Sequence, residues 1–167
     1  PGSPNMVASV GIVIGKRARY LTKENAKGAI AGYFLSNDVS ERNFQIERSG
    51  GQWNKGKSCE TFGPIGPWFV TKDEIKNPQN LDMWLDVNGE RRQTGNTKTM
   101  IFDCEHIVWY CSQFMVLEAG DIIITGTPPG VALGMKPVPG FLKEGDVVTL
   151  GIEGLGEQRQ KVVKGKK

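Results

Sequence analysis

The chain has 167 residues, of which 38% are hydrophobic and 23% are charged, and its formal net charge is +3. A chain of this length forms one domain and buries most of the apolar surface that it exposes when unfolded. No aromatic residues alternate with basic ones as a nucleic-acid stacking platform requires, and no stretch approaches the ~20 apolar residues of a membrane span. The composition therefore predicts a protein with neither nucleic-acid nor membrane partners.

The chain ends and the cysteines bear on domain boundaries and compartment. Residues 1–3, Pro-Gly-Ser, are typical of a cloning scar, so we assign a single domain to residues 4–167. The lysine-rich run 164–167 is typical of a solvated tail. Three cysteines without paired spacing indicate a reducing compartment, and we expect a cytoplasmic location.

The first half of the chain contains two expected strands and a long irregular segment. Residues 10–14 form a β-branched run, and residues 33–39 form a second apolar run that is typical of a strand. Between them, Thr22 is a candidate cap for a short helix over residues 23–30, with Gly32 as its stop. Residues 40–67 show no periodicity, which predicts a loop, and a loop of that length is usually functional.

The second half adds a hairpin, a helix and further strands. Residues 81–87 alternate between apolar and polar, Asn88-Gly89 is a strong turn signal, and residues 90–93 return. Apolar residues recur at helical spacing from Cys104 to Met115. We expect a buried strand at 122–124 and a pair of strands at 148–152 and 158–163. The predicted fold class is β-rich α+β, with two short helices packed on sheets.

A cysteine–histidine nucleophilic site is one interpretation of the reactive residues. Cys59 stands two residues after Lys57, whose ammonium group could lower the pKa of the thiol. Nothing in the spacing brings Cys59 to the single histidine, His106. We therefore interpret His106 as a surface or hydrogen-bonded residue of the predicted helix. Cys104 and Cys111 share the apolar face of that helix and are predicted core residues.

Two glycine-rich loops, residues 50–61 and 125–131, are stronger candidates for a site. Their backbone N–H groups can approach a ligand closely, and their hydroxyls and lysine suit anionic oxygen. Neither loop contains the G-x-x-x-x-G-K-[ST] pattern of a phosphate-binding loop. On their own, the loops leave ligand binding and ordinary turn chemistry both open.

Four segments at these loops resemble the fumarylacetoacetate hydrolase family in order and spacing. They are NDVSERNFQ at 37–45, QWNKGK at 52–57, MIF at 100–102 and TGTP at 125–128. The resemblance extends from about residue 10 to residue 163. Within the family, residues 45–48 and 133–137 are most similar to the L-fuconate and L-rhamnonate subgroup, which hydrolyses 2,4-diketo-3-deoxy sugar acids.

The resemblance implies a mixed β-sandwich roll that assembles as a homodimer and acts on a small 2-oxo or diketo acid. It also implies a Mg²⁺ or Mn²⁺ ion held by three carboxylates, which stabilises the enolate left after C–C cleavage. Two carboxylates belong to a Glu-x-Glu pair on one strand face, and the third is the Asp of the Asn-Asp-Val segment, here Asp38.

The resemblance also implies roles for five further residues. Lys57 and Thr127 take catalytic roles: Lys57 supplies positive charge to the substrate's oxygens, and the Thr127 hydroxyl holds its carboxylate with the help of Gly126. Arg42 and Gln45 orient the rest of the substrate. We expect Asp38, Lys57 and Thr127 to converge on one pocket.

The chain departs from the family pattern at two points. Aligning residues 11–15 with the family places Val7 and Ser9 where the two glutamates belong, and neither can replace a carboxylate. We therefore expect weak ion binding at Asp38. We also expect the chain to lack the family's upstream segment, a lid whose His and Glu activate water.

Three interpretations follow. The first is a metal-dependent hydrolase that cleaves a C–C bond in a 2,4-diketo acid, impaired in this chain. The second is a decarboxylase or isomerase of a related 2-oxo acid, of the oxaloacetate or 2-hydroxyhepta-2,4-diene-1,7-dioate type. The third belongs to another class: a truncated domain that folds and self-associates without turnover.

Overall fold

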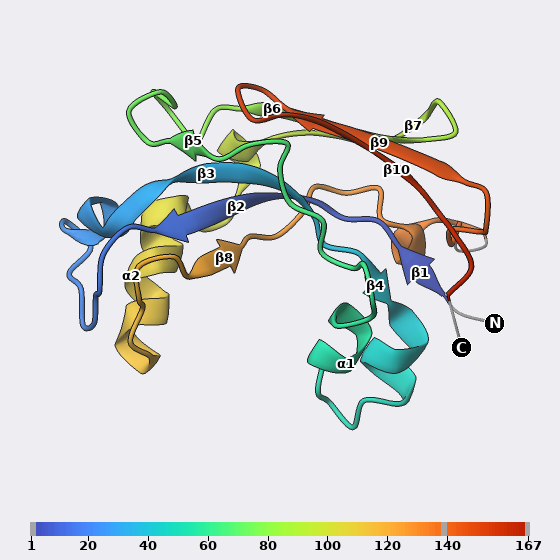
Figure 1. The fold of residues 1–167 in the computed structure, drawn as a ribbon, viewed down its shortest axis with the longest axis horizontal. Helices are drawn as coiled ribbons and strands as arrows, with labels where there is room; N and C mark the ends of the chain where they lie inside the picture. Colours follow the sequence, from blue (N-terminus) through green and yellow to red (C-terminus); the bar gives the residue numbers. More distant parts are fainter. Residues whose placement is uncertain (1–2, 138–139, 166–167) are drawn as a thin grey trace.

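Two four-stranded antiparallel sheets pack against each other in the computed structural model, which describes residues 3–137 and 140–165 (Figure 1). The first sheet has the order β5 (Val70–Thr71), β3 (Ile30–Asn37), β2 (Ala8–Ile14), β8 (Ile122–Ile124). The second has the order β10 (Gly156–Lys161), β9 (Val147–Ile152), β6 (Asp82–Val87), β7 (Glu90–Asn96). A short pair, β1 (Pro4–Asn5) with β4 (Ser40–Glu41), lies at one end. The β-rich α+β sandwich predicted from the sequence is confirmed.

The core lies between the two sheets, and the period of two in each strand builds it. In β2, Ala8, Val10, Ile12 and Ile14 join a buried cluster that also contains Leu85 of β6 and Leu150 of β9. The alternate residues of β2 face away from that cluster. The strands predicted at 10–14, 33–39, 81–87, 90–93, 148–152 and 158–163 therefore form, with shifts of a few residues at their ends.

Two predicted local signals are confirmed beside the sheets. Asn88 and Gly89 adopt φ of 54° and 80°, the left-handed geometry of a tight hairpin turn between β6 and β7. The predicted helix forms as α2 (Cys104–Phe114), and the Asp103 carboxylate caps it by accepting the His106 amide at 2.6 Å. No helix in residues 3–137 and 140–165 is long and apolar enough to cross a membrane.

Three local predictions are wrong. The helix over residues 23–30 is only a 3₁₀ turn, η1 (Ala26–Ala29), because β3 begins at Ile30, and Thr22 does not cap it. Residues 40–67 are not a plain loop, since β4, the π-helical turn η2 (Asn43–Glu47) and the short helix α1 (Asn54–Lys57) form there. The strand at 122–124 is an edge strand, and Ile122 is 47% exposed rather than buried.

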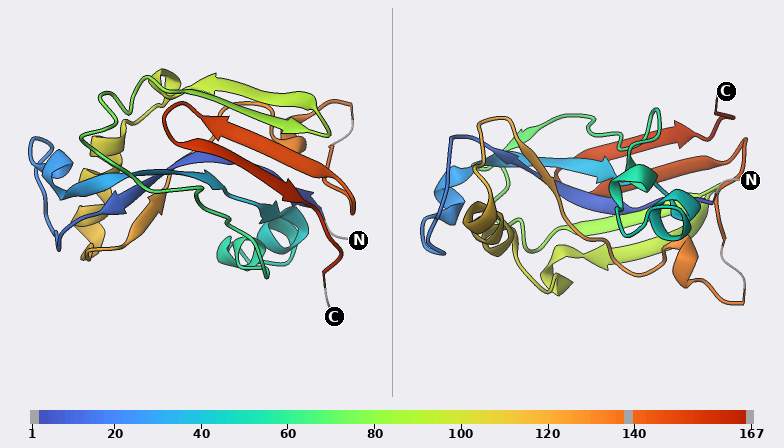
Figure 2. Two further views of the ribbon diagram at one scale, coloured as in Figure 1. Left: turned by 45° about the horizontal axis from the view of Figure 1, so that its top comes forward. Right: turned by 90° about the horizontal axis from the view of Figure 1, so that it is seen from below.

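The remaining short turns are η3 (Thr97–Thr99) and η4 (Ala132–Gly134), both 3₁₀. Helix α2 covers one end of the first sheet, and α1 with η2 lies at the other end (Figures 1 and 2). The segment that the sequence marks as functional therefore packs at the end of β2 and β3 that is remote from α2.

Candidate functional site

The outward face of β2 and β3 carries the positions singled out by the sequence. Ser9 pairs with Ser36, and the Asp38 amide donates to the Val7 carbonyl at 2.8 Å, so the two strands stay in register to residue 38. Because side chains alternate, Val7, Ser9, Ser36 and Asp38 share the face turned away from the core. The expected placement of positions 7 and 9 beside Asp38 is therefore consistent with the strand register.

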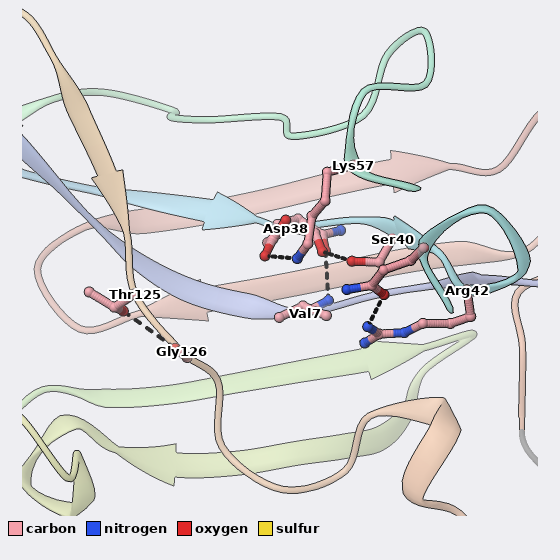
Figure 3. A network of polar contacts seen from close by, with 9 residues as sticks. Val7, Asp38, Ser40, Arg42, Lys57, Thr125 and Gly126 are labelled. Carbon is pink, nitrogen blue, oxygen red and sulfur yellow. Dashed lines mark hydrogen bonds and ion pairs between the residues drawn. The ribbon is translucent and has the colours of Figure 1, made fainter. Parts of the chain in front are cut away.

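Lys57 reaches this face from α1, and its ammonium group donates to Asp38 Oδ2 (Figure 3). The Lys57 and Asp38 side chains are 28% and 21% exposed. Gly56 makes the approach possible, because a Cβ there would lie 2.5 Å from both the Gln45 Cβ and the Glu41 carbonyl oxygen. Only a residue without a side chain lets α1 rest this closely on η2.

Arg42 and Gln45 form the neighbouring part of the site. The Arg42 Nη1 donates to the Gln45 Oε1, and the Gln45 side chain is fully buried. Burial lowers the pKa of the Arg42 guanidinium, and the Asp38 carboxylate opposes that shift. Arg42 keeps its charge, because guanidinium does not deprotonate in proteins. Gln45 thus supports Arg42, and a direct contact of Gln45 with substrate stays a prediction.

Glu41 is the other carboxylate of this segment, and it has a structural task. Its Oε1 accepts the Ser3 amide, and its Oε2 accepts the Phe44 amide at 2.6 Å. Both oxygens therefore hold backbone where β4 meets η2. Glu41 therefore has a structural role at this junction, and we do not assign it to ion binding.

Thr127 and Gly126 lie in the lining of a cavity. They line a cavity of about 350 Å³ together with Met100 and Phe102, so the MIF and TGTP segments of the sequence meet there. Asp38 and Lys57 do not line this cavity. The Thr125 amide ties the loop to β2 by donating to the Val10 carbonyl at 3.0 Å. The Thr125 hydroxyl donates to the Gly126 carbonyl at 3.3 Å (Figure 3).

Gln93, which the sequence analysis did not single out, connects the two parts. Its Oε1 accepts the Ala8 amide at 3.1 Å, and its Nε2 donates to Thr127 Oγ1 at 2.9 Å and to the Pro128 carbonyl at 2.8 Å. The side chain is 1% exposed. The sequence could have indicated Gln93 as a structural residue, because a glutamine at an inward position of a half-buried strand needs hydrogen-bond partners.

Replacing Gln93 by alanine is expected to lower the free energy of unfolding by about 2 kcal/mol, because it leaves the buried Ala8 amide unpaired. Urea denaturation measures this loss. The exposed Gln52 provides the control, and Gln52→Ala is expected to change stability by less than about 0.5 kcal/mol. Equal effects of the two substitutions would show that the Gln93 hydrogen bonds do not hold the loop.

The residues at positions 7, 9 and 38 do not fit the divalent ion that the resemblance implies. Val7 offers no donor atom, the buried Ser9 hydroxyl is neutral, and Asp38 already binds the Lys57 ammonium. Across residues 3–137 and 140–165, no group of three or more His, Cys, Asp or Glu side chains could hold a metal. A hard dication needs several oxygen ligands, preferably charged.

The cysteine–histidine interpretation finds no support. Burial and the charge of Glu41 raise the pKa of the Cys59 thiol, so Lys57 does not activate it as the sequence suggested. His106 lies on α2, at the other end of the sheet, where its ring stacks on Phe102 with centroids 4.5 Å apart. The prediction of Cys104 as a core residue is confirmed.

Comparison with known proteins identifies the family. The family model for the C-terminal domain of fumarylacetoacetate (FAA) hydrolase matches residues 3–163. The chain belongs to the fumarylacetoacetate hydrolase family. Its four family segments form two groups in the structure: 37–45 and 52–57 meet at the Asp38–Lys57 pair, and 100–102 and 125–128 meet at the cavity.

Several members of the fumarylacetoacetate hydrolase family with solved structures are similar to the chain. Fumarylacetoacetate hydrolase from Exiguobacterium antarcticum is 43% identical with a TM-score of 0.91, covering 96% of this chain and 57% of that one. A 2-hydroxyhepta-2,4-diene-1,7-dioate isomerase from Mycobacterium marinum is 39% identical with a TM-score of 0.85, covering 98% and 60%. Maleylpyruvate hydrolase from Sphingobium sp. SYK-6 is 33% identical with a TM-score of 0.84, covering 98% and 56%.

Curated relatives are more similar in sequence. A protein of Burkholderia cenocepacia, whose name assigns it provisionally to the hydrolases, is 57% identical over 152 residues, which is 91% of this chain and 54% of that protein. The chain thus spans about half the length of the curated relatives that it matches. Its relatives include both hydrolases and isomerases, so family membership alone does not select one reaction.

Proposed function

We propose that this chain carries the substrate site of a hydrolase that cleaves a C–C bond in a small 2,4-diketo acid. The contact between Lys57 and Asp38 carries the proposal, because it places a cation on the sheet face where the family segments meet. Arg42, whose charge interacts with Asp38, adds a second cation close by. Two cations beside one carboxylate suit a substrate that carries a carboxylate and an adjacent oxo group.

The chain's own residues support binding and orientation more than bond cleavage. Lys57 would neutralise the charge that grows on the substrate's oxo oxygens, and Arg42, held by Gln45, would align its carboxylate. Thr127 and Gly126 line the neighbouring cavity, which has room for the rest of a diketo acid. Their contact with the carboxylate is part of the proposal.

The family's Mg²⁺ or Mn²⁺ would supply a Lewis acid when bound. Since Val7 and Ser9 cannot ligate it as carboxylates would, we assign no step of the reaction to an ion in this chain. The substrate class of the L-fuconate and L-rhamnonate subgroup, a homodimeric state and a cytoplasmic location belong to the same proposal, and they rest on the resemblance and on the cysteine pattern.

One observation favours a second candidate function. Val7 and Ser9 are 5% and 0% exposed, so buried apolar or neutral groups occupy the positions of the expected glutamates. This suits a non-catalytic domain that folds and associates with a second copy.

Decarboxylation or isomerisation of a 2-oxo acid would use the same cations, and the isomerases among the solved relatives keep these reactions open.

Turnover of acetylpyruvate, oxaloacetate and a 2-hydroxyhepta-2,4-diene-1,7-dioate analogue, each with and without Mn²⁺, separates these functions. The proposed hydrolase is expected to cleave acetylpyruvate slowly and at least about tenfold faster than Lys57→Met does, because the charged contact is lost. Faster loss of oxaloacetate or faster isomerisation would assign the other reactions. No turnover of any substrate, in a folded chain that forms dimers, would support the non-catalytic domain.

A further inference from the structure

The sheet face that carries Ser9, Ser36 and Asp38 lacks the carboxylate ligands that a dication needs. It nevertheless keeps two cationic side chains close by, Lys57 and Arg42. We propose that it binds a small dicarboxylate or 2-oxo acid anion directly, without a divalent metal ion. The proposal rests on the proposed function, because it states how the same site holds that substrate class.

The charge at this face favours an anion over a metal ion. Lys57 contacts Asp38, and the charge of Arg42 also acts on Asp38, so two positive groups stand against one carboxylate. The Glu41 carboxylate is held by two backbone amides. A pair of glutamates carries a charge opposite to that of the dication it binds. Replacing the two glutamates by neutral residues and losing the dication therefore leaves the net charge of the face unchanged, and its attraction for an anion persists.

Unpaired buried groups give a second, independent indication of a ligand. The hydroxyls of Ser9 and Ser36 are both fully buried, and neither has a hydrogen-bond partner. They lie opposite each other in the strand register, on the same face as Asp38. The Arg42 Nε is also buried without a partner. Such atoms are rare in folded proteins, and an ordered water between the two serines and a bound anion would satisfy their hydroxyls.

Oxalate is the probe that tests this proposal, because it presents two carboxylates and no reactive bond. Calorimetric titration of the chain with potassium oxalate in EDTA is expected to show binding that Mn²⁺ does not strengthen. Lys57→Met is expected to weaken this binding by about tenfold or more. The matched control is Lys55→Met, since Lys55 lies exposed on the same short helix, and it is expected to bind like the unmodified chain.

Asp38→Asn distinguishes the two modes of binding, because they predict opposite changes in oxalate affinity. Asparagine keeps the shape of the side chain and its oxygen for Lys57, but it removes the negative charge that competes with the ligand. Direct anion binding therefore predicts that oxalate binds roughly threefold to tenfold more tightly to Asp38→Asn. An ion-mediated site predicts weaker binding, because Asp38 would be its only charged ligand. If Lys57→Met does not fold, Asp38→Asn still decides the question.

Each remaining outcome has one meaning. Binding that appears only with Mn²⁺ overturns direct anion recognition and leaves the proposed function standing. Oxalate binding in EDTA that is unchanged in Lys57→Met, or that is weaker in Asp38→Asn, would show that oxalate does not bind at this face. A chain that binds oxalate neither with nor without Mn²⁺ overturns both this proposal and the proposed substrate class.

Discussion

The double variant Val7→Glu/Ser9→Glu is expected to bind Mn²⁺ at least about a hundredfold more tightly than the unmodified chain, because ligand charge largely sets affinity for hard cations. The strand register places both new side chains on the face of Asp38. With three carboxylates on one face, Mn²⁺ would displace the Lys57 ammonium from Asp38. Isothermal titration with MnCl₂ measures the change.

A matched variant separates charge from shape. Val7→Gln/Ser9→Gln introduces side chains of nearly the same size without charge, and it is expected to gain much less affinity. The glutamates enter positions that are 5% and 0% exposed, so without the ion they should also destabilise the fold. Mn²⁺ should therefore raise the melting temperature of the glutamate variant more than that of the glutamine variant.

The same variant checks the link with anion binding. Once three carboxylates face the site, oxalate should bind only when Mn²⁺ supplies the missing positive charge. A double variant that folds but binds Mn²⁺ no better than the unmodified chain would show that positions 7 and 9 do not correspond to the family's glutamates.

The strands and α2 could be predicted because their signals are local and repeat. Residues 81–87 alternate, Asn88-Gly89 turns the chain, and Cys104 to Met115 follow a helical period. The segment 40–67 had no such signal, since η2 and α1 are each about one turn long. Packing of one on the other stabilises them, and no window of sequence reports a contact of that kind.

The site was predictable in part, and for a similar reason. Asp38 and Lys57 come from segments whose order resembles a family, and the structure places them in contact. Gln93 was missed because its role depends on three partners from β2 and from the loop after β8. The two orphaned hydroxyls, Ser9 and Ser36, could not be found either, since burial without a partner is a property of the packed chain.

Gly56→Ala is expected to separate Lys57 from Asp38 while most of the fold persists. A methyl group at this position would lie 2.5 Å from the Glu41 carbonyl oxygen and from the Gln45 side chain, closer than real atoms approach. The backbone of Gly56 is not left-handed, so lack of space is the only obstacle to alanine. Relief requires α1 to move away from η2, and Lys57 is the last residue of α1.

The effect of Gly56→Ala should appear in both stability and binding. Overpacking at a close contact is expected to lower the free energy of unfolding by about 1–3 kcal/mol, and displacement of Lys57 should weaken oxalate binding by at least about tenfold. Gly134→Ala is the control, because a methyl group there meets no atom within 4 Å, and it should change neither quantity. If Gly56→Ala binds oxalate as tightly as the unmodified chain, then close packing of α1 on η2 is not what aims Lys57 at Asp38, and the anion must be held by groups that do not depend on this helix.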